Sequence, residues 1–129
     1  MDKVELKIRT KKFAMRVLKL ADALPRSVSG RILANQIARA GTSVAANYRA
    51  ACRAKSKADF ISKLGTVEEE ADETLFWLEL AVESSLVPAK KLGLLMQETE
   101  ELLKIVVASL RTMRKNQFQN PKSEIRNPK

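Results

Sequence analysis

Apolar residues recur at steps of three and four along four long stretches of this chain. That spacing puts them on one face of an α-helix, and such a face must be buried against other helices. Four glycines and four prolines in 129 residues leave few points at which a helix would break. The spacing therefore predicts an all-α protein of four helices, long enough to bury a core as one domain.

Proline and serine mark where the predicted helices begin and end. Pro25 ends the first helix, because the residue before a proline is pushed out of the α region. Ser27 or Ser29 can cap the second helix, and Ser56 can cap the third. The predicted helices cover about residues 4–24, 30–54, 57–83 and 88 onward. Their short loops predict neighbours that run in opposite directions, as in an antiparallel up-down four-helix bundle.

The apolar residues of the four stripes are expected to form the core. Beside them, Gly41 lies among small residues that would let another helix approach closely, and Gly65 predicts a second close crossing. The residues expected in the core are Leu6, Phe13, Val17, Leu20, Leu24, Leu33, Ile37, Ala40, Val44, Tyr48, Ala51, Phe60, Leu64, Val67, Ala71, Leu75, Leu78, Val82, Leu92, Leu95, Thr99, Leu102, Val106, Ser109 and Met113.

Charge is distributed unevenly around a net +9. Residues 1–57 contain fourteen Lys and Arg against three Asp and Glu, residues 58–110 contain four against eleven, and residues 111–129 contain six against one. A basic surface beside an acidic one can bind a polyanion, or the two can pair between subunits. Charge alone leaves both alternatives open.

Arginines share one side of the second predicted helix, within a sector about 80° wide at 100° per residue. The nucleic-acid hypothesis assigns phosphate contacts to Arg31, Arg39, Arg49, Arg53, Lys55 and Lys57. The alternative is a protein-interaction scaffold in which the arginines pair with glutamates of a neighbouring subunit, such as Glu69, Glu70 or Glu73. The first helix also has a basic face, either a solvated surface or a further nucleic-acid contact, formed by Lys7, Arg9, Lys11, Lys12, Arg16 and Lys19.

Large apolar side chains on the outer side of the third predicted helix indicate a surface that another protein covers. Phe76, Trp77 and Leu80 point away from its core side. On the second helix, Ser43 and Asn47 belong to a polar strip that would hydrogen-bond a neighbouring helix or subunit. These five residues form the predicted oligomer interface.

The residue types present exclude several classes of function. With no histidine and only Cys52, the chain cannot form a His-based triad, a common zinc site or an internal disulfide. Its glycines are isolated, so no phosphate-binding loop is present. No stretch is long and apolar enough to cross a bilayer. We expect a cytoplasmic protein with no enzymatic activity, no metal, no cofactor and no membrane contact.

The chain changes character after Lys115. The remaining segment, NQFQNPKSEIRNPK, contains two prolines, few apolar residues and a net positive charge. Such a composition cannot bury enough apolar surface to fold by itself. We therefore predict a four-helix domain over residues 1–115 and a disordered basic tail over residues 116–129.

A series of residues, in order, matches one known family. They are Gln36, Arg39, Ala40, Ser43, Val44, Asn47, Arg53, Ser56, Asp59, Phe60, Glu70, Glu73, Trp77 and Leu78. Through them the chain resembles the four-helix-bundle proteins encoded by intervening sequences in bacterial large-subunit ribosomal RNA genes, over roughly residues 3–113. Where many relatives have Asn-x-x-Glu-Gly, this chain continues Asn47-Tyr48-Arg49-Ala50-Ala51, which adds to the arginine side.

The resemblance implies up-down four-helix bundles that assemble into a ring-shaped homopentamer, with Phe76, Trp77 and Leu80 at or near subunit contacts. A related branch of the family assists the reverse transcriptases of diversity-generating retroelements by binding nucleic acid through a basic surface. The expected partners are therefore further copies of the chain, RNA or DNA, and a reverse transcriptase or another protein. We expect a non-enzymatic, oligomeric nucleic-acid-binding protein.

Overall fold

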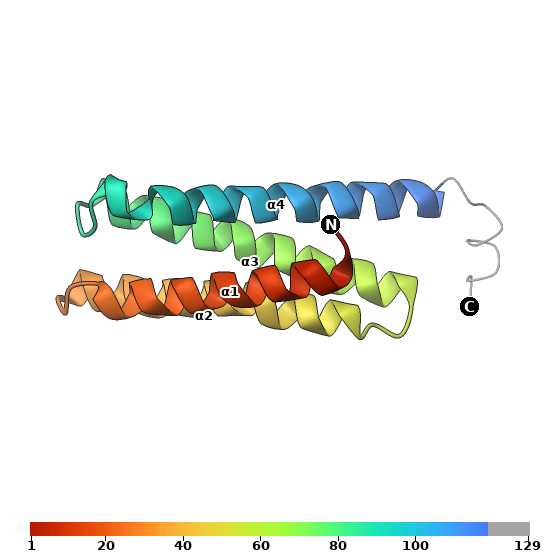
Figure 1. Ribbon diagram of the computed structural model, residues 1–129, viewed down its shortest axis with the longest axis horizontal. Helices are drawn as coiled ribbons and strands as arrows, with labels where there is room; N and C mark the ends of the chain where they lie inside the picture. The colour runs from red at the N-terminus through yellow and green to blue at the C-terminus, as the bar shows by residue number, and fades with distance from the viewer. Residues whose placement is uncertain (119–129) are drawn as a thin grey trace.

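A computed structural model describes the backbone of residues 1–118 and the side chains of residues 1–116. The chain forms four helices, labelled in Figure 1: α1 (Lys3–Ala23), α2 (Val28–Cys52), α3 (Lys57–Glu83) and α4 (Ala89–Phe118). Within residues 1–118 there is no strand. The prediction of an all-α protein of four helices is confirmed.

Serine hydroxyls determine where two of the helices begin. Ser27 Oγ accepts a hydrogen bond from the backbone N–H of Gly30 at 3.0 Å, and Ser56 Oγ accepts one from the N–H of Asp59 at 3.0 Å. Each bond satisfies a backbone donor that has no partner inside the helix. Ser27, rather than Ser29, is therefore the N-cap of α2, and the predicted cap of α3 is confirmed.

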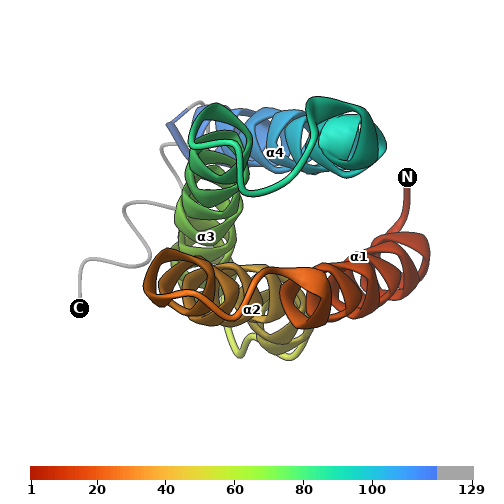
Figure 2. The same cartoon turned by 90° about the vertical axis from the view of Figure 1, so that its left-hand side faces the viewer.

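Each helix packs on the one before it in the chain, whereas α1 and α4 have little direct contact. Figure 1 shows α2 and α3 running in opposite directions on either side of the turn that joins them. Seen along the helices, the four ribbons form an arc with α1 and α4 at its two ends (Figure 2). The bundle is therefore held mainly by three helix pairs.

One cluster of ion pairs connects the two ends of this arc. Arg9 Nε and Nη2 donate to the two carboxylate oxygens of Glu98, each at 2.7 Å, and Nη2 also donates to Glu101 at 3.0 Å. These hydrogen bonds, chiefly those to Glu98, raise the pKa of Arg9 because they stabilise its charged form. Arg9 thus links α1 to α4 where apolar packing contributes little.

The core follows the predicted stripes closely. Nineteen of the twenty-five residues expected in the core are buried, and the apolar residues Ala14, Ala81, Val87 and Leu110 join them. The other six are only half-buried because they lie at the flanks of stripes or near helix ends: Leu20, Phe60, Leu75, Val82, Ser109 and Met113.

Two glycines that the sequence singles out have opposite surroundings. A Cβ placed on Gly41 would lie 2.5 Å from Val17 Cγ1, so the absence of a side chain lets α1 and α2 approach closely there. At Gly65 no atom lies within 4 Å of such a Cβ. The predicted close crossing at Gly65 is wrong, because no neighbouring helix of this chain packs against that position.

The last helix is longer than predicted. Residues 116–118, placed in the disordered tail by composition, continue α4 to Phe118. None of the three is a proline or glycine, so nothing in them stops a helix that is already formed. The rest of the predicted tail, residues 119–129, lies outside the described residues.

Candidate nucleic-acid interface

A groove between α1 and α2 collects four positive side chains. It has a volume of about 530 Å³. Lys7 and Lys11 come from α1, Arg49 comes from α2, and Arg53 is the residue that caps the C-terminus of α2. The remaining lining residues are Ile8, Thr42, Ala45 and Ala46, so no acidic residue lines this groove. We refer to these eight residues as the basic groove.

Helical spacing and helix pairing bring these four cations together. Lys7 and Lys11 are four residues apart, as are Arg49 and Arg53, so each pair shares one helix face. Val17 lies against Gly41, and α1 and α2 run in opposite directions (Figure 1). Residues six to ten positions before Val17 therefore lie near the level of residues six to ten positions after Gly41. Lys7 and Lys11 bound the first window, Arg49 lies inside the second, and Arg53 lies two residues beyond it.

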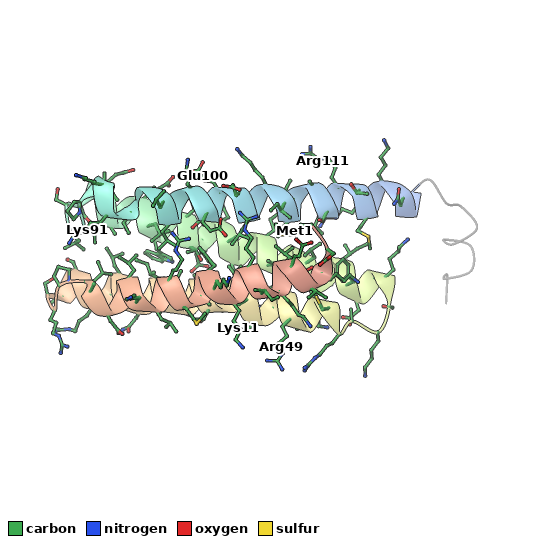
Figure 3. The ribbon with its side chains drawn as sticks, viewed as in Figure 1. Met1, Lys11, Arg49, Lys91, Glu100 and Arg111 are labelled. Atoms are coloured by element: carbon green, nitrogen blue, oxygen red, sulfur yellow. The ribbon has the colours of Figure 1, made fainter. Side chains whose placement is uncertain are left out.

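The base of the basic groove is formed by residues with small side chains. Ala45, Ala46 and Thr42 line it on the α2 side, and the hydroxyl of Thr42 is already bonded to the carbonyl of Ala38 at 2.7 Å. The longer lysine and arginine side chains therefore rise on both sides of a shallow surface. Figure 3 shows Lys11 and Arg49 projecting on the same side of the molecule, away from α3 and α4.

The positive charges of the four cations in the basic groove are not neutralised by neighbouring side chains, so they are available to a ligand. All four are exposed, and none forms an ion pair with any side chain of residues 1–116. Lysine ammonium and arginine guanidinium groups only donate hydrogen bonds, and phosphate oxygens only accept them. The arrangement suits a row of phosphates lying along the α1–α2 surface.

Two of the six predicted phosphate contacts, Arg49 and Arg53, lie in the basic groove. Arg39 lies elsewhere, because its guanidinium pairs with Glu73 and, at 3.3 Å, with Glu70, both on α3 of the same chain. The sequence hypothesis considered such pairing only between subunits. Arg39 thus contributes to the contact between α2 and α3 within one chain.

The other three predicted contacts lie at the ends of α2. Arg31 is in the first turn of α2, and its Nη1 donates to the backbone carbonyl of Arg26 at 2.9 Å. Lys55 and Lys57 are exposed at the turn between α2 and α3, where they line a different pocket. The structure therefore does not gather the six predicted residues on one continuous face.

Lys7 and Lys11 are outside the six predicted phosphate contacts, although the basic face to which they belong is one of the two alternatives that the sequence left open for the first helix. The sequence does contain a feature that points to them, because Lys7 and Lys11 are four residues apart, as Arg49 and Arg53 are. What the sequence lacked was the alignment of α1 against α2, which depends on the packing of Val17 on Gly41.

The predicted oligomer interface is partly exposed in the single chain. Phe76 and Leu80 are 52% and 37% exposed. Trp77 is half-buried, its ring lies edge-on to Phe76 with centroids 5.0 Å apart, and its Nε1 donates to Glu73 at 3.0 Å. Ser43 and Asn47 are also half-buried, and Asn47 Nδ2 donates to the Ser43 carbonyl at 2.8 Å within α2.

One more apolar residue belongs beside Leu80. Arg39 of α2 pairs with Glu73 of α3. Seven residues before Arg39 is Ile32, which is 54% exposed, and seven residues after Glu73 is Leu80. Because seven residues are about two helical turns and the helices run in opposite directions, Ile32 and Leu80 fall at the same level. Ile32, Phe76, Trp77 and Leu80 are called the apolar patch below.

Comparison with known proteins connects this fold to a family. The family model described as "23S rRNA-intervening sequence protein" matches residues 2–108. The chain belongs to this family. No curated protein matches the sequence.

A solved structure of the same kind of protein supports the fold. It is a protein of unknown function from the S23 ribosomal protein family of Bacteroides thetaiotaomicron. The two sequences are 32% identical, the match covers 86% of this chain and 99% of that chain, and the TM-score is 0.80. The resemblance to the intervening-sequence family is thus confirmed.

Within residues 1–118, no helix is both long enough and apolar enough to cross a membrane. Nor do residues of the described part bring together three His, Cys, Asp or Glu side chains that could hold a metal ion.

Proposed function

We propose that this member of the intervening-sequence family is a non-enzymatic, oligomeric protein that binds nucleic acid through the basic groove. The observation that supports it is the set of four unpaired cations, Lys7, Lys11, Arg49 and Arg53, in a groove that no acidic residue lines. Such a surface recognises the phosphate backbone and not base edges. RNA and DNA are both candidates, in a cytoplasmic setting.

The proposal includes assembly of several copies. The resemblance points to a homopentamer ring, and the apolar patch offers a surface that a second copy would cover. Repetition of the basic groove around a ring would multiply a modest affinity without any new contact. A reverse transcriptase or another protein that works on nucleic acid would be a further partner of such an assembly.

Salt dependence tests the nucleic-acid proposal. Purified protein is titrated with a structured RNA and a DNA of equal length across a salt series, and its mass is measured in the same buffers. Four phosphate contacts per groove predict a log–log slope of about −4 on DNA. Lys7→Gln with Lys11→Gln should reduce the magnitude of that slope by about two.

A matched variant controls for net charge. Lys90 and Lys91 are exposed at the beginning of α4, far along the chain from the groove. Lys90→Gln with Lys91→Gln removes the same charge and should leave the slope nearly unchanged. Equal losses in the two variants, or no binding at low salt, would contradict the proposed groove.

The alternative function is a protein-interaction scaffold whose basic and acidic faces pair between subunits. The apolar patch and the acidic residues of α3 favour it, because an exposed apolar surface beside charge suits a protein partner. Arg49→Glu with Arg53→Glu separates the two. Loss of nucleic-acid binding at unchanged mass supports the groove, whereas dissociation into monomers supports the scaffold.

A further inference from the structure

A second pocket lies at the end of the molecule where α1 and α3 begin. It has a volume of about 660 Å³, within the range of roughly 300–1,000 Å³ typical of small-molecule sites. All four helices and the turn between α2 and α3 contribute to it. Met1, labelled in Figure 3, is one of its lining residues. We call it the end pocket.

The walls of the end pocket are mostly apolar. Leu6, Tyr48 and Leu64 are buried side chains that form its inner part. Phe60, Ile105 and Met113 are only half-buried, although each is a large apolar residue on a helix. Apolar walls that remain partly uncovered gain free energy when an apolar ligand displaces water from them. The pocket therefore favours a hydrocarbon group.

The mouth of the end pocket is positively charged. Lys3, Lys55 and Lys57 line it, and no acidic residue does. All three lysines are exposed, and their ammonium groups form no ion pair with residues 1–116. Lys3 Nζ lies 4.6 Å from the centroid of the Phe60 ring, which holds this charge directly over an apolar wall.

The two acids nearest in sequence to these lysines already have partners. Asp2 Oδ1 accepts from the N–H of Glu5 at 2.8 Å, where it caps α1. Asp59 Oδ1 accepts from Lys63 Nζ at 2.7 Å, and its Oδ2 accepts from the backbone N–H of Lys55 at 3.3 Å. Neither carboxylate forms an ion pair with the three lysines, although the charge of Lys55 is near enough to help lower the pKa of Asp59.

Tyr48 does not add a negative charge to the pocket. Burial raises the pKa of its phenol, and the adjacent Cys52 raises it further. The phenol is therefore neutral at physiological pH. Apolar walls, a neutral interior and cations at the mouth match a molecule with an apolar body and one anionic end.

We propose that the end pocket binds a small amphipathic anion, with its hydrocarbon portion against Phe60, Leu64 and Ile105 and its carboxylate or phosphate at the three lysines. This site is separate from the basic groove, whose lining residues are entirely different. A bare phosphate backbone would leave the apolar walls uncovered. Lys55 and Lys57, predicted as nucleic-acid contacts, serve this ligand instead.

Cys52 supplies a direct readout of occupancy. It is the single cysteine of the chain, it is not in a disulfide, and it lines the end pocket. The full-length protein is alkylated with N-ethylmaleimide in increasing concentrations of decanoate, decyl phosphate or decanol, each below its micelle concentration. Decanoate or decyl phosphate should slow alkylation saturably, and decanol should need a higher concentration. The stronger of the two anions identifies the headgroup.

Two variants test the assignment. Lys55→Gln with Lys57→Gln should raise the half-protecting concentration of the anion by about threefold to tenfold, and leave that of decanol unchanged. Ala108→Phe fills the pocket from an exposed position of α4 and should abolish protection, whereas Ala23→Phe, exposed at the end of α1, should not. Helical content measured by circular dichroism establishes that each variant is folded.

Several results would overturn the proposal. They are no protection by any probe, equal protection by decanol and the anions, or protection that survives Ala108→Phe in a folded protein. Occupation of the pocket by another part of the chain would also appear as no protection, since the full chain is used. None of these outcomes depends on nucleic-acid binding, so the two proposals can fail separately.

Discussion

Gly41 shows how one missing side chain determines the position of a helix. Val17, whose methyl groups would lie against a Cβ at Gly41, is completely buried in the core. A fully packed valine cannot rotate away without displacing its neighbours. Since this contact aligns α1 with α2, it also places Lys7 and Lys11 opposite Arg49 and Arg53.

Gly41→Ala should therefore destabilise the protein by about 1–3 kcal/mol, because overpacking a tight core outweighs the better helix propensity of alanine. Gly65→Ala is the matched control, since its Cβ would meet nothing within 4 Å. It should stabilise the protein by about 0.5–1 kcal/mol. Urea unfolding measures both, and changes of the same sign would show that the two glycines do not differ as described.

At the scale of elements, the weak point of the bundle is the pair formed by α1 and α4. The other neighbouring helices share apolar surfaces, whereas these two are connected mainly through Arg9. The guanidinium of Arg9 holds Glu98 with two parallel hydrogen bonds, a geometry stronger than a single contact. Both side chains are mostly shielded from solvent, at 24% and 17% exposure, whereas Glu101 is 60% exposed.

Arg9→Ala should lower the free energy of unfolding by about 1–3 kcal/mol, since it removes charged hydrogen bonds and leaves Glu98 without its partner. Glu101→Ala removes only an exposed contact and should cost about 0.5 kcal/mol or less. Thermal or urea unfolding at low and moderate salt measures both effects. A loss for Glu101→Ala as large as that for Arg9→Ala would contradict the leading role of Glu98.

At the scale of the whole molecule, charge and apolar surface are separated. The basic groove lies on α1 and α2, and the apolar patch lies on α2 and α3 together with most of the acidic residues of the chain. The proposed assembly surface and the proposed nucleic-acid surface could therefore be occupied at the same time. This separation makes the interface testable without disturbing the groove.

Leu80→Arg should raise the dissociation constant of the assembly by about tenfold or more, because an unpaired charge would be buried in the contact. Leu94→Arg is the matched control, as Leu94 is 74% exposed on α4 and outside the patch. Light scattering at several concentrations measures the mass of both variants. A monomeric wild type, or equal masses for all three proteins, would show that the predicted interface is wrong.

The periodicity of apolar residues was sufficient to predict the helices and most of their buried faces. The apolar side of a helix is buried away from water whichever helix packs against it. Ile37, Val44 and Leu78 are buried for that reason. The same reasoning wrongly predicted a close helix crossing at Gly65. The apolar pattern of one helix shows which side is buried, but it does not show where along that side another helix makes contact.

Tertiary structure decided which of the basic residues are paired within the chain and which remain exposed to a ligand. Arg39 and Arg49 have the same chemistry and belong to the same predicted stripe, yet Arg39 pairs with Glu73 of α3 and Arg49 lines a groove with Lys7 of α1. Helical spacing alone could identify these residues as basic. Only the packing of α2 between α1 and α3 decided which charges are neutralised within the chain and which face a ligand, since that requires knowing what lies across each helix contact.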